Sequence, residues 1–218
     1  MPSPSKTKRW GRADLLAAAL ACLCLLAACA APRPTASGFL SDYGRLRPDP
    51  TQMGLSWWEE PGAPWPSYKK LLIEPVQVRL TDQAEGGEVG AAERTRLAKA
   101  LRQAVLKALA GRHQVVERPG SGVLRVRAAL TRLKPVSPAL NVVSTAVMMW
   151  PMDVGEAALE AQFLDSRSNR VLGELVIVNQ GSTLDLGRVW TRWAQVEAAF
   201  AEWARLFVQA LEEPPAGR

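Results

Sequence analysis

Hydrophobic and polar residues alternate over several segments in the second half of the chain, which is the period-two pattern of half-buried β-strands. The clearest alternation runs over 123–133 and again over 155–165. Turn-forming residues at 165–169 predict a hairpin between the second of these strands and another strand over 170–179. Two further segments are also expected to form strands, namely 69–80 and 114–117.

Two further segments have the spacing of amphipathic helices. Over 91–110, leucine and valine residues recur every four positions, and Gly111 follows as a stop signal. Over 186–211, large apolar residues recur every three or four positions, and such a seam must be buried against another element. The apolar positions of this second seam are Val189, Trp193, Val196, Phe200, Trp203, Phe207 and Ala210.

This order of elements predicts a single α+β domain over residues 67–213. A mostly antiparallel or mixed sheet with two helices packed on one face is the simplest arrangement that buries both helical seams. The preceding stretch, 38–66, is rich in Trp, Pro and Gly and has neither periodicity, so we expect an extended arm lying over the domain. Four side chains would hold this arm by burial: Phe39, Leu40, Tyr43 and Leu46.

The N-terminal segment resembles a bacterial lipoprotein signal. Basic residues precede an apolar run of 14 residues up to Ala28, which is shorter than the roughly 20 residues needed to cross a bilayer. The run ends in Leu-Ala-Ala-Cys29, which resembles a lipobox and implies cleavage between Ala28 and Cys29 and lipidation of Cys29. Residues 1–28 would be removed, and residues 29–37 would be the lipidated cysteine and a flexible tether. The alternative is an ordinary signal peptide.

Charge and cysteine placement narrow the function classes. Removal of the signal leaves 23 basic and 20 acidic residues without a Lys/Arg cluster, so we expect no nucleic-acid partner. All three cysteines lie at or before Cys29 and the single histidine is His113, so we expect no disulfide and no metal site in the domain. We also expect no cofactor, because the glycine pairs lack the spacing of a phosphate-binding loop.

Three passages are distinctive beyond their periodicity: Ser37–Asp49 in the arm, Tyr68–Val76 in the first strand, and Asp153–Asp165. Together with the lipobox, they resemble a bacterial lipoprotein family known as domain of unknown function 3313, over about Ser37–Leu211. The resemblance implies an envelope location and supplies no catalytic residues. The layout is also similar to small envelope lipoproteins that assist transport or assembly machines, although fold alone does not give function.

The segment 138–151 is a candidate interaction surface. It is apolar, lies between two predicted strands and is bracketed by prolines. One interpretation is a buried crossover or an extra helix that completes the core. The other is an exposed apolar surface for a protein partner or the membrane. The candidate partner-binding residues are Val147, Met148, Met149 and Trp150.

Aromatic residues of the arm form a second candidate site. Trp57, Trp58 and Trp65 lie with Tyr68 among prolines. Exposed rings of this kind stack on sugar faces, which would suit binding to a glycan such as peptidoglycan. The alternative is that the rings anchor the arm to the sheet through their large apolar area.

Four carboxylates cluster around one predicted strand: Asp153, Glu156, Glu160 and Asp165. Glu156 and Glu160 occupy outward positions, so we expect them to face Arg125 and Arg127 across the sheet rather than to form a catalytic acid/base pair. Glu74 precedes a proline inside the first strand and is expected to mark an edge or a bulge.

These features predict an outer-membrane lipoprotein whose domain faces the periplasm. The outer-membrane destination follows by resemblance to enterobacterial sorting signals, because Cys29 is followed by Ala30 and not by Asp. We expect a non-catalytic accessory role in an envelope assembly or transport complex, with an envelope protein as partner. The alternative is a module that binds a glycan, peptidoglycan or a lipid. The sequence pattern leaves the oligomeric state open.

Overall fold

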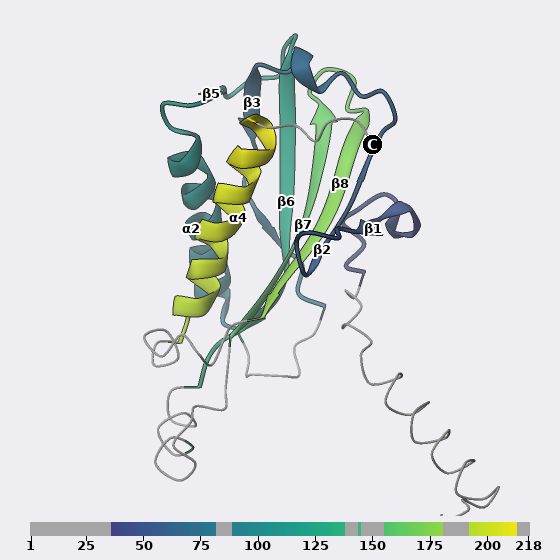
Figure 1. Ribbon diagram of the computed structural model, residues 1–218. Coiled ribbons are helices and arrows are strands. Elements are labelled where there is room, and N and C mark those ends of the chain that lie inside the picture. Colours follow the sequence, from purple (N-terminus) through teal and green to yellow (C-terminus); the bar gives the residue numbers. More distant parts are fainter. Residues whose placement is uncertain (1–35, 82–88, 138–143, 145–154, 181–191, 213–218) are drawn as a thin grey trace, which may run out of the picture. The chain divides into compact units, whose positions relative to one another are not determined.

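The computed structural model describes residues 36–81, 89–137, 144, 155–180 and 192–212 (Figure 1). In these residues, an 8-stranded sheet has the order β1-β2-β8-β7-β6-β3-β5, and β4 also pairs with β6. The strands are β1 (Arg47–Pro48), β2 (Leu55–Glu59), β3 (Lys70–Ile73), β4 (Gln77–Val78), β5 (Gln114–Val115), β6 (Val123–Lys134), β7 (Glu156–Asp165) and β8 (Val171–Gln180). The helices are α2 (Ala91–Leu109) and α4 (Ala194–Glu212), with short 3-10 helices η1 (Tyr43–Arg45) and η2 (Trp65–Ser67).

Three long strands form the centre of the sheet. β6, β7 and β8 are antiparallel neighbours, and β7 and β8 form the predicted hairpin. On the β6 side of this centre, the pairing is parallel: β3 and β4 pair with β6, and β5 pairs with β3. On the β8 side, β2 pairs with β8 and β1 pairs with β2, both antiparallel. The sheet is therefore mixed, and the predicted α+β fold class is confirmed.

Both helices cover the same face of the sheet and lie side by side (Figure 1). Leu97 and Leu101 of α2 and Phe200 of α4 are buried against Leu130 of β6 and Leu159 of β7. A second apolar cluster continues this interface toward β3. Full burial of each large apolar side chain contributes about 1.5–3 kcal/mol, so this face supplies the main hydrophobic core.

The boundaries of three predicted elements differ from the sequence pattern. The strand expected over 69–80 is divided, because β3 ends before Glu74 and Pro75 has no backbone N–H to donate. Glu74, which was expected to mark an edge or a bulge, lies at this break between β3 and β4. β5 occupies only the first two residues of the strand expected over 114–117. The last helix begins at Ala194, and residues 186–191 of its predicted range lie outside the described residues.

The predicted arm, 38–66, has two parts. Its first part lies on the sheet face opposite the helices, where Phe39 and Leu40 are buried against Ala129 and Val176. Its second part differs from the expectation, because β2 is a regular strand that pairs with β8. All residues of β2 are half-buried. Its sequence, Leu-Ser-Trp-Trp-Glu, does not alternate between apolar and polar residues, so the pattern did not indicate a strand.

Candidate functional site

We define the back face as the sheet face opposite α2 and α4. It carries a row of polar side chains, with Glu160 and Gln162 on β7 and Glu174 on β8. The exposed fractions of Glu160 and Glu174 are only 0% and 1%. A buried carboxylate is destabilising unless hydrogen bonds or opposite charges replace its water. The partners of these two carboxylates therefore show how the back face is built.

Ser37, the last residue of the predicted tether, and Tyr43 of the arm are the partners of Glu160, so the ordered arm begins one residue earlier than expected. Ser37 Oγ donates to Glu160 Oε2 at 2.7 Å, and Tyr43 Oη donates to the same oxygen at 2.6 Å. The backbone N–H of Ser37 donates to Oε1 at 3.2 Å. Tyr43 Oη also accepts the N–H of Phe39 at 3.1 Å. One carboxylate of the sheet thus holds the first residues of the arm in place.

Glu174 binds the next residues of the arm. Ser41 donates to Glu174 Oε1 from its N–H at 2.8 Å and from Oγ at 2.7 Å, and Arg45 Nη2 donates to Oε2 at 2.7 Å. The Arg45 guanidinium also lies 3.5 Å from the centroid of the Trp58 ring, which is a cation–π contact. We call this set of residues the arm clamp: Ser37, Ser41, Tyr43, Arg45, Glu160 and Glu174.

Opposing effects set the pKa of Glu174. Burial raises it, because a buried charge loses hydration, while hydrogen bonds from Gln162, Ser41 and Arg45 lower it. The hydrogen bonds prevail, so the pKa lies below the ordinary value of 4.5. Glu174 is therefore held as a carboxylate, which suits a group that accepts hydrogen bonds and not one that gives up a proton near neutral pH.

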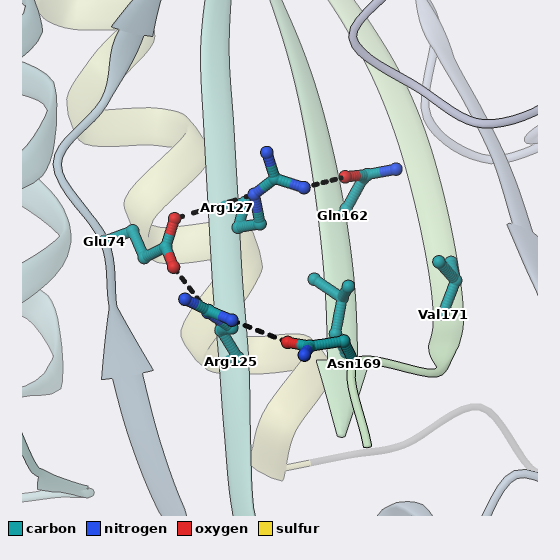
Figure 2. A pocket seen from close by; sticks show the side chains of 7 residues that line it. Glu74, Arg125, Arg127, Gln162, Asn169 and Val171 are labelled. Atoms are coloured by element: carbon teal, nitrogen blue, oxygen red, sulfur yellow. Dashed lines mark hydrogen bonds and ion pairs between the residues drawn. The ribbon is translucent and has the colours of Figure 1, made fainter. Parts of the chain in front are cut away.

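A pocket of about 410 Å³ opens on the back face next to the arm clamp (Figure 2). In the β6–β7 register, Arg125 lies opposite Leu164 and Arg127 opposite Gln162, so these four side chains share the back face. The division between β3 and β4 brings Glu74 to the same place, and the β7–β8 hairpin adds the remaining lining residues. The lining consists of Glu74, Arg125, Arg127, Gln162, Leu164, Asn169 and Val171.

Glu74 lies between the two arginines, as Figure 2 shows. It accepts a hydrogen bond from Arg125 Nε, and its second oxygen lies 3.6 Å from Arg127 Nε. Arg127 Nη1 donates to Gln162 Oε1 at 3.0 Å, and Gln162 Nε2 donates to Glu174 Oε1 at 2.7 Å. A continuous set of polar contacts therefore joins the pocket to the arm clamp.

The β7–β8 turn supports the pocket from one side. Asn169 has a φ of 59°, in the left-handed region that asparagine tolerates, and its Oδ1 accepts from Arg125 Nη1 at 2.6 Å. Asp165 organises the same turn by accepting from the N–H and Oγ of Ser168, both at 2.8 Å. These hydrogen bonds are the main reason that the pKa of Asp165 is lowered to about 2.

Some of the candidate residues from the sequence lie outside the described residues. They are the cleavage and lipidation residues Ala28 and Cys29, the candidate partner-binding residues Val147, Met148, Met149 and Trp150, and Asp153. The interpretations of these residues stay predictions.

The three candidate sugar-stacking tryptophans are all half-buried and are divided between the two faces of the sheet. The β2–β8 register places Trp57 on the helix side of the sheet and Trp58, opposite Glu174, on the back face. Trp65 packs edge-on against Phe163, with ring centroids 6.3 Å apart. The structure therefore does not bring the three rings together as one stacking surface, and binding of peptidoglycan stays a prediction.

The expected pairing of Glu156 and Glu160 with Arg125 and Arg127 was wrong. Arg132 binds Glu156 at 2.6 Å, and Glu160 lies beneath the arm. The two arginines instead contact the acid at the break in the first strand. Alternation gives the face of each residue and not the register between strands, so this partner could not be identified from the pattern alone.

Neither a membrane-spanning helix nor a metal-binding cluster is found among the described residues. No helix there is long and apolar enough to cross a bilayer. Within the same ranges, no group of 3 or more His, Cys, Asp or Glu residues is placed to hold a metal ion.

Comparison with protein families identifies the domain. The family model described as "Protein of unknown function (DUF3313)" matches residues 35–207. The chain belongs to the DUF3313 family. The matched range includes every residue of the arm clamp and of the pocket, so both are parts of the DUF3313 domain. A comparison with curated proteins gave no match.

Several solved structures are similar to this DUF3313 chain at low sequence identity. The PelC dodecamer from Paraburkholderia phytofirmans is 8% identical with a TM-score of 0.41, covering 69% of this chain and 94% of that chain. A candidate neuraminyllactose-binding hemagglutinin homolog from Helicobacter pylori is 14% identical with a TM-score of 0.37, covering 70% and 86%. A candidate lipoprotein from Caulobacter crescentus is 17% identical with a TM-score of 0.31, covering 66% and 92%. At these TM-scores, the likenesses carry no inference about function.

Proposed function

We propose that this DUF3313 protein is a non-catalytic accessory lipoprotein of the bacterial envelope. In this proposal, Cys29 anchors it to the outer membrane and the domain faces the periplasm, where it docks on an assembly or transport complex. The observation that carries the proposal is the arm clamp. The chain that follows the lipobox is held on the sheet from Ser37 onward by two buried carboxylates.

The short tether supports a role close to the membrane. Eight residue steps join Cys29 to Ser37. Since an extended chain spans at most about 3.6 Å per residue, Ser37 stays within about 29 Å of the lipidated cysteine. That limit is similar to the roughly 30 Å thickness of a bilayer core. This upper limit supports the proposal that the lipid-anchored protein acts close to the membrane.

The chemistry of the buried carboxylates supports a structural role for them. Glu160 and Glu174 both accept several hydrogen bonds from the arm. The pKa of Glu174 is lowered, whereas a general acid that works near neutral pH needs a raised carboxyl pKa. Glu174 is therefore suited to holding the arm and not to proton transfer.

Palmitate labelling tests the anchor. Wild-type protein is expected to incorporate labelled palmitate and to fractionate with the outer membrane, while Cys29→Ala does neither. Processed, membrane-bound and labelled Cys29→Ala protein would contradict the lipidation site.

Photocrosslinking in cells tests the accessory role. Met53 is 93% exposed, so a photoreactive residue placed there leaves the core intact. A second position, Trp150, tests the candidate partner-binding segment. We expect a discrete protein adduct from at least one position in lipidated protein, and its loss in Cys29→Ala. Adducts to lipid alone would favour the lipid-binding alternative, and no adduct from either position would contradict a stable protein partner at these surfaces.

A further inference from the structure

We propose that the back-face pocket is a binding site for a small organic oxyanion, a carboxylate or phosphate monoester that carries a short apolar group. Arg125 and Arg127 bind the anionic group, and Leu164 and Val171 contact the apolar part. The proposal concerns a ligand of the domain, so it does not depend on the lipid anchor or on a protein partner.

The two arginines keep hydrogen-bond donors for a ligand. A guanidinium has five N–H donors. Arg125 uses Nε for Glu74 and Nη1 for Asn169, and Arg127 uses Nη1 for Gln162. Within the described part of the chain, Nη2 of neither arginine donates a hydrogen bond. The arginine side chains are 29% and 33% exposed, so a molecule in the pocket can reach them.

The charge around the pocket favours an anion. Glu74 provides one carboxylate between two guanidinium groups. In the lining of the pocket, two arginines therefore face one glutamate. One positive charge remains, and a monoanion would neutralise it.

The size and lining of the pocket favour an organic molecule over an inorganic ion. Its volume of about 410 Å³ falls in the range of roughly 300–1,000 Å³ that is usual for small-molecule sites. Leu164 and Val171 form apolar lining beside the arginines. Planar guanidinium groups match carboxylate and phosphate oxygens in bidentate geometry. An oxyanion with a short apolar group therefore matches both parts of the lining.

A purely structural role for Arg125 and Arg127 explains only part of the features of the pocket. Contact with Glu74 would hold β6 to the break between β3 and β4, which accounts for the Nε groups of both arginines. It does not account for the Nη2 donors, the excess positive charge or the open volume beside them. These three features are explained together by a bound oxyanion.

Calorimetric titration of the full lipidated chain in detergent micelles tests the proposal. The probes are butyrate and monobutyl phosphate, with 1-butanol as the uncharged control and inorganic phosphate as the control without an apolar group. We expect saturable binding of at least one organic anion, about tenfold or more tighter than either control. The preferred probe identifies the carboxylate or the phosphate class. Absence of saturable binding of both anions, or equal binding of 1-butanol, would overturn the proposal.

Three variants locate the binding. Arg125→Lys and Arg127→Lys keep the charge and lose the planar fork, so each is expected to weaken binding about tenfold or more. Val171→Phe keeps both arginines and fills the pocket. Among the probes, the organic anions should lose the most binding affinity in this variant. Arg170→Lys is the matched control, because Arg170 lies in the same hairpin and pairs with Glu60 at 3.5 Å outside the pocket lining.

Melting temperatures of the variants separate loss of binding from loss of folding. If a lysine variant is unfolded, Val171→Phe decides the outcome. Unchanged affinity in Val171→Phe and in every folded lysine variant would overturn the proposal, because the ligand would then bind elsewhere.

Discussion

The two faces of the sheet are held by different physical means. On the helix face, α2 and α4 bury a continuous apolar core that includes Leu97, Leu130 and Phe200. On the back face, the arm is held by a smaller apolar cluster and by hydrogen bonds to Glu160 and Glu174. Apolar burial is non-directional, whereas hydrogen bonds to a buried charge require particular donors at particular distances. The helix face thus stabilises the fold, and the back face determines where the N-terminal chain lies.

Removal of a large side chain from the helix face is expected to have the largest effect. Phe200 is 1% exposed and packs on Trp203. Phe200→Ala should lower the free energy of unfolding by about 3–5 kcal/mol, because it removes apolar contacts and leaves a cavity. Urea unfolding measures the change. Met53→Ala, at a site that is 93% exposed, is the control and should change stability by less than about 0.5 kcal/mol. A loss below about 1 kcal/mol in Phe200→Ala would contradict the proposed core.

Removal of a buried carboxylate from the back face is expected to have the next largest effect. Glu174→Ala leaves Arg45, Ser41 and Gln162 without their shared acceptor. The free energy of unfolding should fall by about 2–3 kcal/mol, since breaking a buried pair on one side leaves its partners unpaired.

A matched control tests whether burial is the reason. Glu202 and Arg205 of α4 form an ion pair of 2.6 Å whose side chains are 42% and 60% exposed. Glu202→Ala should lower stability by less than about 1 kcal/mol, as exposed pairs do. Equal losses of stability in Glu174→Ala and Glu202→Ala would contradict the claim that burial beneath the arm strengthens the contribution of Glu174.

Acidification is expected to weaken the hydrogen bonds through which Glu174 holds the arm. The lowered pKa of Glu174 means that the unfolded chain binds this proton more readily. The ionised Glu174 therefore contributes fully to the free energy of unfolding above a pH near the ordinary value of 4.5. This contribution is lost as the pH falls below that value. Asp165 acts with the same sign in a lower window, from 3.8 to about 2.

Urea unfolding near neutral pH and at about pH 3 checks this sign. The stability difference between wild type and Glu174→Gln should shrink on acidification, while the difference between wild type and Phe200→Ala should persist. A Glu174→Gln difference that is the same at both pH values would contradict the assignment.

Loss of one hydroxyl from the arm clamp is expected to have the smallest effect. Tyr43→Phe removes the 2.6 Å hydrogen bond to Glu160. The free energy of unfolding should fall by about 1–2 kcal/mol, because the acceptor is a charged and buried group. Tyr68→Phe removes a 3.0 Å hydrogen bond to Asp165 in the hairpin turn and should change stability by about 0.5 kcal/mol. A larger loss in Tyr68→Phe would reverse the proposed order.

The helix face could be predicted from the sequence because its signals are local. The spacing of apolar residues gave both helices, and alternation gave the long strands. Both patterns depend only on residues within a few positions of one another. The existence of a sheet with two helices on one face followed from these patterns and was confirmed.

The back face could not be predicted because its chemistry depends on distant contacts. Glu160 and Glu174 occupy polar positions of alternating strands, which is also the pattern of solvent-exposed residues. The arm covers both and donates hydrogen bonds to them, and Tyr43 and Glu160 are 117 residues apart in the chain. The pocket has the same origin, because Glu74 reaches Arg125 across 51 residues through parallel pairing of β3 and β6. No local pattern encodes that pairing.

Amide hydrogen exchange gives the most direct test of the central claim that two buried carboxylates hold the arm on the back face. The comparison is between wild type and the double variant Glu160→Gln, Glu174→Gln. We predict that amides of residues 37–46 exchange about tenfold faster or more in the double variant, and that this acceleration exceeds the one in α2 and α4. Unchanged protection of the arm, or equal acceleration of the arm and the helices, would contradict the account.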